Sequence, residues 1–234
     1  MNDMLNKIKQ DLQKFANKEK VKILQRFFKT GKGQYSEGDI FLGIVVLEQR
    51  KIAKKYSELT LTDIQKLLNS KVHEHRLTSL FILIDKYQRA DQKNRKKIFN
   101  FYLSNTKQIN NWDLVDLSAP NIIGDYLLEK DRKILYKLAR SKNLWEKRIA
   151  IISTFKFIRD NQFTDTLKIS ELLLTDKHDL IHKAVGWMLR EVGKRDQQLL
   201  EKFLDKHLRQ MPRTMLRYAI EKFPENRRLY YLRK

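Results

Sequence analysis

The 234-residue chain carries 49 Lys and Arg against 28 Asp and Glu, a formal net charge of +21. An excess of this size, spread along the chain, favours a polyanionic partner, and nucleic acid is the leading candidate. The alternatives are binding to an anionic membrane surface and a basic protein that has no polyanionic partner. With no cysteine, disulfides, thiolate chemistry and iron–sulfur clusters are excluded. Neither a signal peptide nor a membrane-spanning stretch is recognisable, so we expect a cytoplasmic protein, nucleoid-associated in a bacterium.

The chain is predicted to be helical throughout. It contains only 3 Pro and 7 Gly, fewer turn-forming residues than a β-rich protein needs, and its apolar residues recur with the helical period of 3.6. Asp and Thr stand where helices should begin, as at Thr62, Asp91 and Asp131. The predicted helices are 3–17, 19–28, 39–56, 61–69, 73–89, 91–105, 111–117, 121–128, 131–141, 143–160, 164–174, 178–194, 197–210 and 213–222.

Helix pairs recur at roughly 35 residues, which is the length range of helical-repeat units. Examples are 143–160 with 164–174, and 178–194 with 197–210. We therefore expect an all-α, single-domain protein over 1–234, a HEAT-like α-solenoid of paired antiparallel helices with a concave basic DNA-binding surface. A compact helical bundle is the alternative. We expect the protein to act as a monomer.

The segment 30–38, TGKGQYSEG, is predicted to be a surface loop. It lacks the order of glycines and lysine found in a phosphate-binding P-loop, and no strand precedes it. A plain connection is favoured over a contact with a DNA phosphate.

The segment 110–116, NNWDLVD, places an acidic residue on a surface otherwise suited to DNA. With an Asn as N-cap, Trp112 and Asp116 lie one helical turn apart on the same face. A carboxylate there could stabilise positive charge that develops on a sugar. The alternative is that Asp113 or Asp116 only favours the start of the helix through its dipole.

The predicted helix 143–160 carries Arg148, Lys156 and Arg159 along one stripe, opposite an apolar face. Three cations over three turns are typical of a surface that follows DNA phosphates. The alternative is an ordinary solvated helix face.

In the predicted helix 178–194, Trp187 lies away from the apolar face, and Lys183, Gly186 and Arg190 share the outer side. An aromatic residue beside two cations, above a glycine that clears space, indicates an aromatic platform in a basic groove. The alternative is that Trp187 packs against a neighbouring repeat.

No metal or cofactor is expected. The histidines include one pair spaced by four residues, His178 and His182, but it lacks the glutamate of an H-E-x-x-H zinc motif.

In combination, these segments resemble the AlkD-type DNA alkylation repair family, a group of HEAT-like alkylpurine DNA glycosylases. They span nearly the whole chain in the order found in that family. The matching stretches are Phe41–Ile44 with Arg50, His73–Arg76, Asn111–Asp116, Leu144–Phe155 and Lys183–Lys194.

The resemblance implies a DNA glycosylase that cleaves the N-glycosidic bond of cationic alkylpurines, of the 3-methyladenine and 7-methylguanine types, in duplex DNA during base excision repair. It implies that Asp116 is the catalytic carboxylate, that Trp112 and Trp187 are walls of the site, and that Arg148 belongs to the catalytic cleft. Arg190 is then a DNA-backbone contact. Lys183, Lys156 and Arg159 are expected to bind DNA beside it.

Two alternatives stay open at this point. The first is a non-enzymatic HEAT-like DNA-binding protein that recognises damaged or branched DNA. The second is a helical scaffold or RNA-binding module, which would give Trp187 and Asp116 no shared role.

Overall fold

The computed structural model describes residues 3–233, and within that range it is helical, with one isolated parallel bridge between Ile40 and Val72 in place of any strand. The all-α prediction is confirmed. The chain forms two compact units, Met1–Leu114 and Val115–Lys234, so that the division falls inside one helix. A single domain and a concave basic surface stay predictions. No helix within residues 3–233 is long and apolar enough to cross a bilayer.

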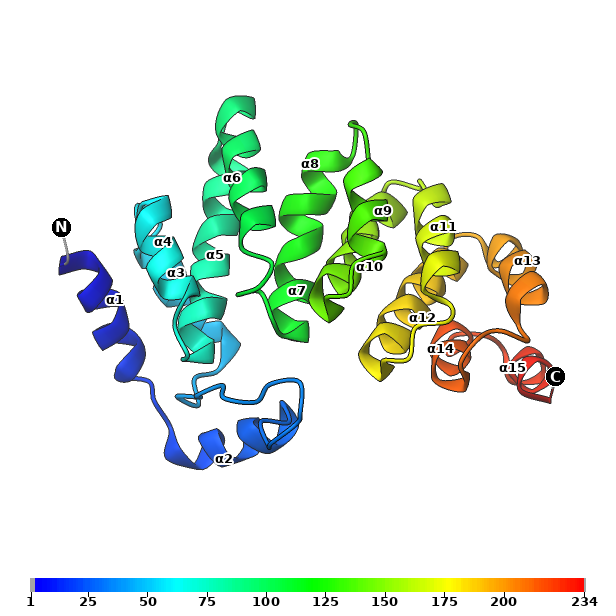
Figure 1. Ribbon diagram of the computed structural model, residues 1–234, viewed down its shortest axis with the longest axis horizontal. Coiled ribbons are helices and arrows are strands. Elements are labelled where there is room, and N and C mark those ends of the chain that lie inside the picture. The colour runs from blue at the N-terminus through cyan, green and yellow to red at the C-terminus, as the bar shows by residue number, and fades with distance from the viewer. Residues whose placement is uncertain (1–2, 234) are drawn as a thin grey trace. The chain divides into compact units, whose positions relative to one another are not determined.

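The first unit is built around the long helix α5 (His73–Arg89), whose side chains are mostly buried. Figure 1 shows α5 between neighbouring helices, and α3, α4 and α6 all pack against it. Helix α2 differs from the others because none of its residues is buried. The other helices of this unit are α1 (Asp3–Gln13), α2 (Lys18–Phe27), α3 (Val46–Lys55), α4 (Leu61–Leu68) and α6 (Gln92–Ser104).

The second unit has α10 (Leu144–Arg159) at its centre, because α9, α11 and α12 pack around it and bury both of its faces. Helix α12 (Asp179–Gly193) in turn packs against α13 and α14. This succession of neighbouring helices is what the repeat spacing predicted. The remaining helices are α7 (Trp112–Ala119), α8 (Asp125–Leu127), α9 (Lys133–Ala139), α11 (Thr164–Leu173), α13 (Gln197–His207), α14 (Arg213–Ala219) and α15 (Glu225–Arg233).

The predicted helix 39–56 is wrong in its first part, because α3 begins only at Val46. Gly43 has a φ of +83°, and a Cβ at this position would lie 2.2 Å from the backbone oxygen of Asn17. The Glu74 carboxylate accepts hydrogen bonds from the backbone N–H groups of residues 42–44, at 2.8–3.3 Å. A partner distant in sequence therefore satisfies the backbone here and replaces the helical hydrogen bonds.

The break predicted between 111–117 and 121–128 is also wrong. Pro120, which lacks an N–H group, changes the hydrogen-bond pattern without ending the helix. A π-helical turn, η1 (Pro120–Gly124), therefore joins α7 to α8.

Among the predicted helix starts, Asp91 caps α6 by accepting from the Asn94 N–H at 2.8 Å, as expected. Thr62 lies inside α4, whose N-cap is Thr60. Helix α15 lies beyond the last predicted helix and was missed.

Candidate functional site

Asp116 and Arg148 form a close ion pair in the second unit. Arg148 donates from Nε to Oδ1 of Asp116 at 2.8 Å and from Nη2 to Oδ2 at 2.7 Å. The remaining guanidinium nitrogen, Nη1, donates to the backbone oxygen of Leu180 at 2.5 Å. The Arg148 side chain is 6% exposed and that of Asp116 14%. The carboxylate is thus held in one orientation by a two-point contact and keeps a small opening to solvent.

This pair changes the interpretation of the stripe on 143–160. Arg148 is buried and paired with Asp116, and Ile152, which lies between Arg148 and Lys156 on the same side of the helix, is fully buried. Helix α10 is surrounded by other helices, so its charged residues do not form one continuous solvated face. Nearer the end of the helix, Lys156 is half-buried and Arg159 is exposed.

Trp187 is half-buried on α12 and contacts Phe155 of α10, with ring centroids 5.7 Å apart and planes inclined by 48°. The guanidinium carbon of Arg159 lies 4.3 Å from the centroid of the same Phe155 ring. Trp187 therefore packs against a neighbouring helix, as one interpretation of the sequence expected. It also reaches solvent, as an aromatic platform would require.

Gly186 does not clear space for a ligand, contrary to the sequence interpretation. A Cβ at this position would lie 2.5 Å from the backbone oxygen of Met215 and 2.5 Å from the Cβ of Tyr218. The glycine lets α14 approach α12 closely.

Three of the other predicted DNA-binding cations are already paired with carboxylates inside the second unit. These pairs are Lys156 with Asp125 at 2.8 Å, Lys183 with Asp179 at 2.7 Å, and Arg190 with Glu221. By contrast, the Arg159 side chain makes no ion pair and no hydrogen bond with any residue from 3 to 233, and its one recorded contact is with the Phe155 ring. Arg159 is therefore the predicted cation most available to an external anion.

In the first unit, Trp112 belongs to a cluster of aromatic rings. It stacks on Phe28, with centroids 5.1 Å apart and an angle of 15°, and it meets Phe27 edge-on at 5.7 Å. Its indole N–H donates to the Tyr35 hydroxyl at 3.2 Å. The Asn111 side chain accepts from the Trp112 backbone N–H at 2.8 Å. These contacts fix the orientation of the indole ring.

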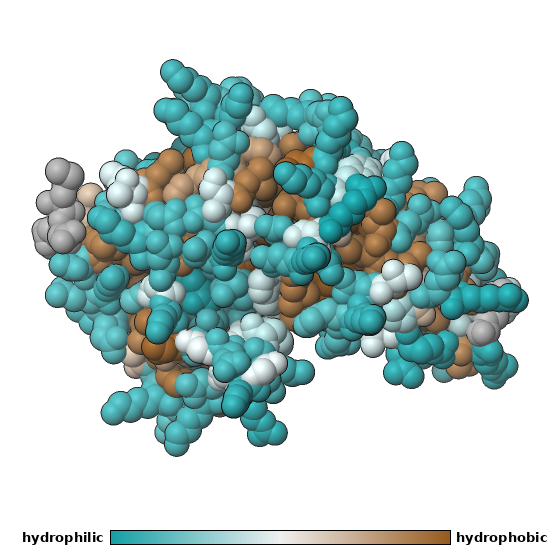
Figure 2. All heavy atoms as spheres, in the orientation of Figure 1, coloured by the Kyte–Doolittle hydropathy of each residue, from teal (hydrophilic) through white to brown (hydrophobic). Residues whose placement is uncertain are grey.

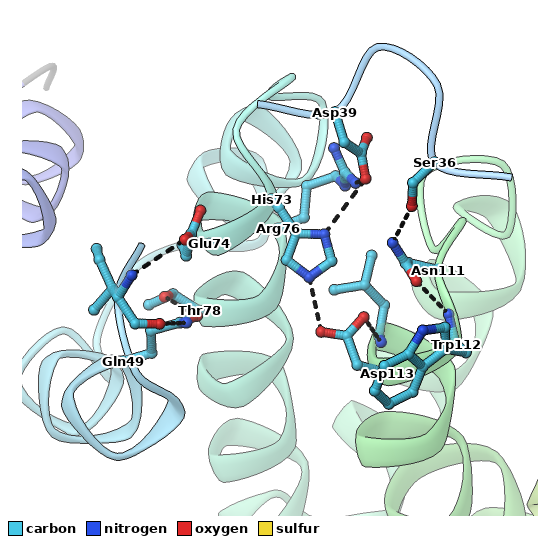
Figure 3. A network of polar contacts seen from close by, with 12 residues as sticks. Ser36, Asp39, Gln49, His73, Glu74, Arg76, Thr78, Asn111, Trp112 and Asp113 are labelled. Carbon is cyan, nitrogen blue, oxygen red and sulfur yellow. Dashed lines mark hydrogen bonds and ion pairs between the residues drawn. The ribbon is translucent and has the colours of Figure 1, made fainter. Parts of the chain in front are cut away.

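Phe28 also contacts His73, with ring centroids 5.0 Å apart, and His73 belongs to a buried network of polar contacts drawn in Figure 3. His73 Nε2 is 2.7 Å from Oδ2 of Asp113, and Nδ1 is 3.4 Å from Oδ2 of Asp39, which also accepts from Arg76 Nη2 at 2.7 Å. Burial by itself lowers the pKa of His73, but the charges and hydrogen bonds of Asp113 and Asp39 outweigh it and raise this pKa to about 9. Asp113 is thus the counter-ion of a buried imidazolium.

Sequence reasoning missed Phe28, Glu74 and Phe155 as supporting residues. The spacing of Phe155 and Arg159 by four residues is a usable signal for a cation above an aromatic ring on one helix. Glu74 and Phe28 contact residues far away in the sequence, so local spacing gave no such signal. Among residues 3–233, no group of three or more His, Asp or Glu side chains could hold a metal ion.

The chain is thus an all-helical repeat protein with a net charge of +21, an oriented carboxylate and a surface that is largely hydrophilic in the view of Figure 2. A family model described as DNA alkylation repair enzyme matches residues 8–223. The chain therefore belongs to the DNA alkylation repair enzyme family, as the sequence resemblance indicated.

One solved structure, a predicted DNA alkylation repair enzyme from Enterococcus faecalis, has the same fold. The similarity covers 90% of this chain and 97% of that one, with a TM-score of 0.70 and 16% sequence identity. No curated protein matches the chain significantly.

Proposed function

We propose that this protein is a DNA glycosylase that hydrolyses the N-glycosidic bond of cationic alkylpurines, of the 3-methyladenine and 7-methylguanine types, in duplex DNA. The observation that carries the proposal is the pair of Asp116 and Arg148. A carboxylate held at two points by a buried arginine, in a chain with a net charge of +21, is suited to an electrostatic role.

The chemistry needs little more than such a group. An alkylated purine that already carries a positive charge is a good leaving group, so its departure needs no strong general acid. The sugar then develops oxocarbenium character, as in other glycoside cleavages. Asp116 is already oriented and stabilises this charge without reorganisation, and it also orients the attacking water.

Trp187 would press against the deoxyribose and exclude solvent, while Arg159, Lys156, Lys183 and Arg190 contact DNA phosphates. No step requires a metal or a cofactor.

The test is release of free base from methylated duplex DNA by the Asp116→Asn variant. Asn keeps the size of the side chain and one acceptor for Arg148, but it removes the charge. We expect base release to fall by about 10²–10³-fold, the usual loss for one electrostatic stabiliser, with DNA binding unchanged or stronger. We also expect a loss of about 1.5–3 kcal/mol in stability, because a hydrogen bond to a charged group is weakened.

The second unit offers a matched control. Arg132 and Asp165 form another half-buried pair, with Nη1 and Oδ2 2.7 Å apart and exposures of 16% and 17%. Asp165→Asn should cost similar stability and leave base release unchanged. Equal losses of turnover in both variants would assign Asp116 a structural role. Asp113→Asn, which removes the counter-ion of His73, should likewise lower stability with little effect on turnover at a temperature where the variant is folded.

The same ion pair also favours one other function. Arg148 neutralises Asp116, and the carboxylate is only 14% exposed, as in a purely structural salt bridge. A non-enzymatic DNA-binding protein would show tight binding to duplex DNA and no base release by the wild-type chain.

A further inference from the structure

Phe155 lies between two residues of the proposed DNA surface. Its ring contacts Trp187 on α12, with centroids 5.7 Å apart, and the guanidinium of Arg159 one turn later on α10, at 4.3 Å. Phe155 itself is half-buried, which fixes the ring between its neighbours, and Arg159 is exposed. The three side chains form a contiguous group, which we call the Trp187–Phe155–Arg159 cluster.

The state of Arg159 distinguishes this cluster from the rest of the proposed surface. Lys156, Lys183 and Arg190 each have a carboxylate partner, so a phosphate must compete with Asp125, Asp179 or Glu221 for them. Arg159 makes no ion pair with residues 3–233, and the cation–π contact orients its planar group without using its N–H donors. All of its donors are available for a bidentate contact with phosphate.

We propose that Phe155 is a positioning residue that holds Trp187 and Arg159 in register, so that a DNA phosphate bound by Arg159 places the adjoining deoxyribose on Trp187. This inference rests on the proposed function and deepens it. A DNA strand carries a phosphate about every 3.4 Å along the helix axis, so two side chains that contact one phenyl ring meet the same or neighbouring nucleotides.

The first test needs no enzymatic activity. The chain contains three tryptophans, Trp112, Trp145 and Trp187, so 5-fluorotryptophan labelling gives three fluorine resonances, and Trp187→Phe assigns one of them. In Phe155→Leu, which removes the ring and keeps an apolar side chain, we expect the Trp187 resonance to shift while the other two stay in place. An unchanged Trp187 resonance would overturn the proposal.

The second test is a double-mutant cycle on binding to undamaged duplex DNA. Arg159→Gln should reduce the slope of log K against log salt by about 0.9, the value for one phosphate contact. Over a range from about 50 to about 200 mM salt, the wild type then loses about threefold more affinity than the variant. In the Phe155→Leu background, Arg159→Gln should change the slope less, because Arg159 is no longer oriented. Strict additivity would show that Phe155 does not act through Arg159.

Tyr126 provides the matched control, because Lys130 lies 4.5 Å from its ring centroid with the same spacing of four residues on the chain. Tyr126→Leu should leave the Trp187 resonance, the salt slope and base release unchanged, and effects equal to those of Phe155→Leu would refute a specific role for Phe155.

The third test measures base release from 7-methylguanine DNA. We expect kcat of Phe155→Leu to fall by up to about 10²-fold, the cost of a misplaced contact, with a smaller change in KM. A loss confined to KM would contradict positioning of Trp187. If the wild type releases no base, the proposed function fails, whereas the fluorine spectra and the binding cycle still decide whether Phe155 holds this cluster together.

Discussion

The buried His73 predicts a loss of stability at alkaline pH. In the folded protein, its pKa is raised from 6.5 to about 9, because the attraction of Asp113 and Asp39 outweighs the effect of burial. The imidazolium is therefore favoured by folding. Each pKa unit corresponds to about 1.36 kcal/mol, so this group contributes about 3 kcal/mol to the free energy of unfolding. This contribution is complete below pH 6.5 and is lost as the pH rises through 9.

The measurement is urea denaturation at several pH values between 6.5 and 9.5 and constant ionic strength, with NMR titration of the histidine rings. His75 has a pKa lowered to about 4, first through burial and then through the charge of Lys9, so it stays neutral over this range. His75 affects stability in the opposite direction: the free energy of unfolding falls as the pH drops below 6.5, because the unfolded state takes up a proton at His75 that the folded state does not. A His73 ring that titrates near 6.5, or a constant free energy of unfolding from pH 6.5 to 9, would refute the reasoning.

Three further substitutions test other parts of the structure. Gly186→Ala should lower stability by about 1–3 kcal/mol through overpacking between α12 and α14, seen as a lower Tm, and an unchanged Tm would contradict the close approach. Glu74→Gln removes the charge of the carboxylate that accepts hydrogen bonds from the backbone of residues 42–44, so limited proteolysis should become faster in that segment. An unchanged cleavage pattern would show that the Glu74 carboxylate does not hold the segment in place. Arg190→Gln should reduce the salt slope of DNA binding by less than the value of about 0.9 for one phosphate, because Glu221 already occupies the arginine, whereas a full decrement would show that this pair opens completely on DNA.

Periodicity and composition were sufficient to predict the helical class and most helices, because amphipathic segments such as α12 bury one face. They failed where a distant side chain determines the backbone conformation. Residues 40–45 read as the beginning of a helix, yet Glu74, about 30 positions away, binds their N–H groups. The break expected at Pro120 failed for a local reason, since a π-helical turn accommodates the proline.

The site shows the same limit. Spacing identified Asp116 as an unusual acid and Arg148 as a cation of interest, but it assigned them to separate tasks. Only the packing of α10 in the second unit shows that they form one pair. The prediction that Trp187 lies on the outer side of its helix was only partly correct, since Phe155 covers part of the indole.

The pairing of Lys156, Lys183 and Arg190 with carboxylates has a consequence for how the protein would search a genome. Each of these cations must exchange an internal anion for a phosphate, so the gain on contact with DNA is smaller than a net charge of +21 suggests. Weaker attachment to ordinary sequence shortens the residence time at each site and favours sliding and hopping. In the proposed glycosylase, the internal carboxylates would compete with DNA phosphates for these three cations. The protein would then continue to slide along undamaged DNA until a damaged nucleotide contacts the Trp187–Phe155–Arg159 cluster.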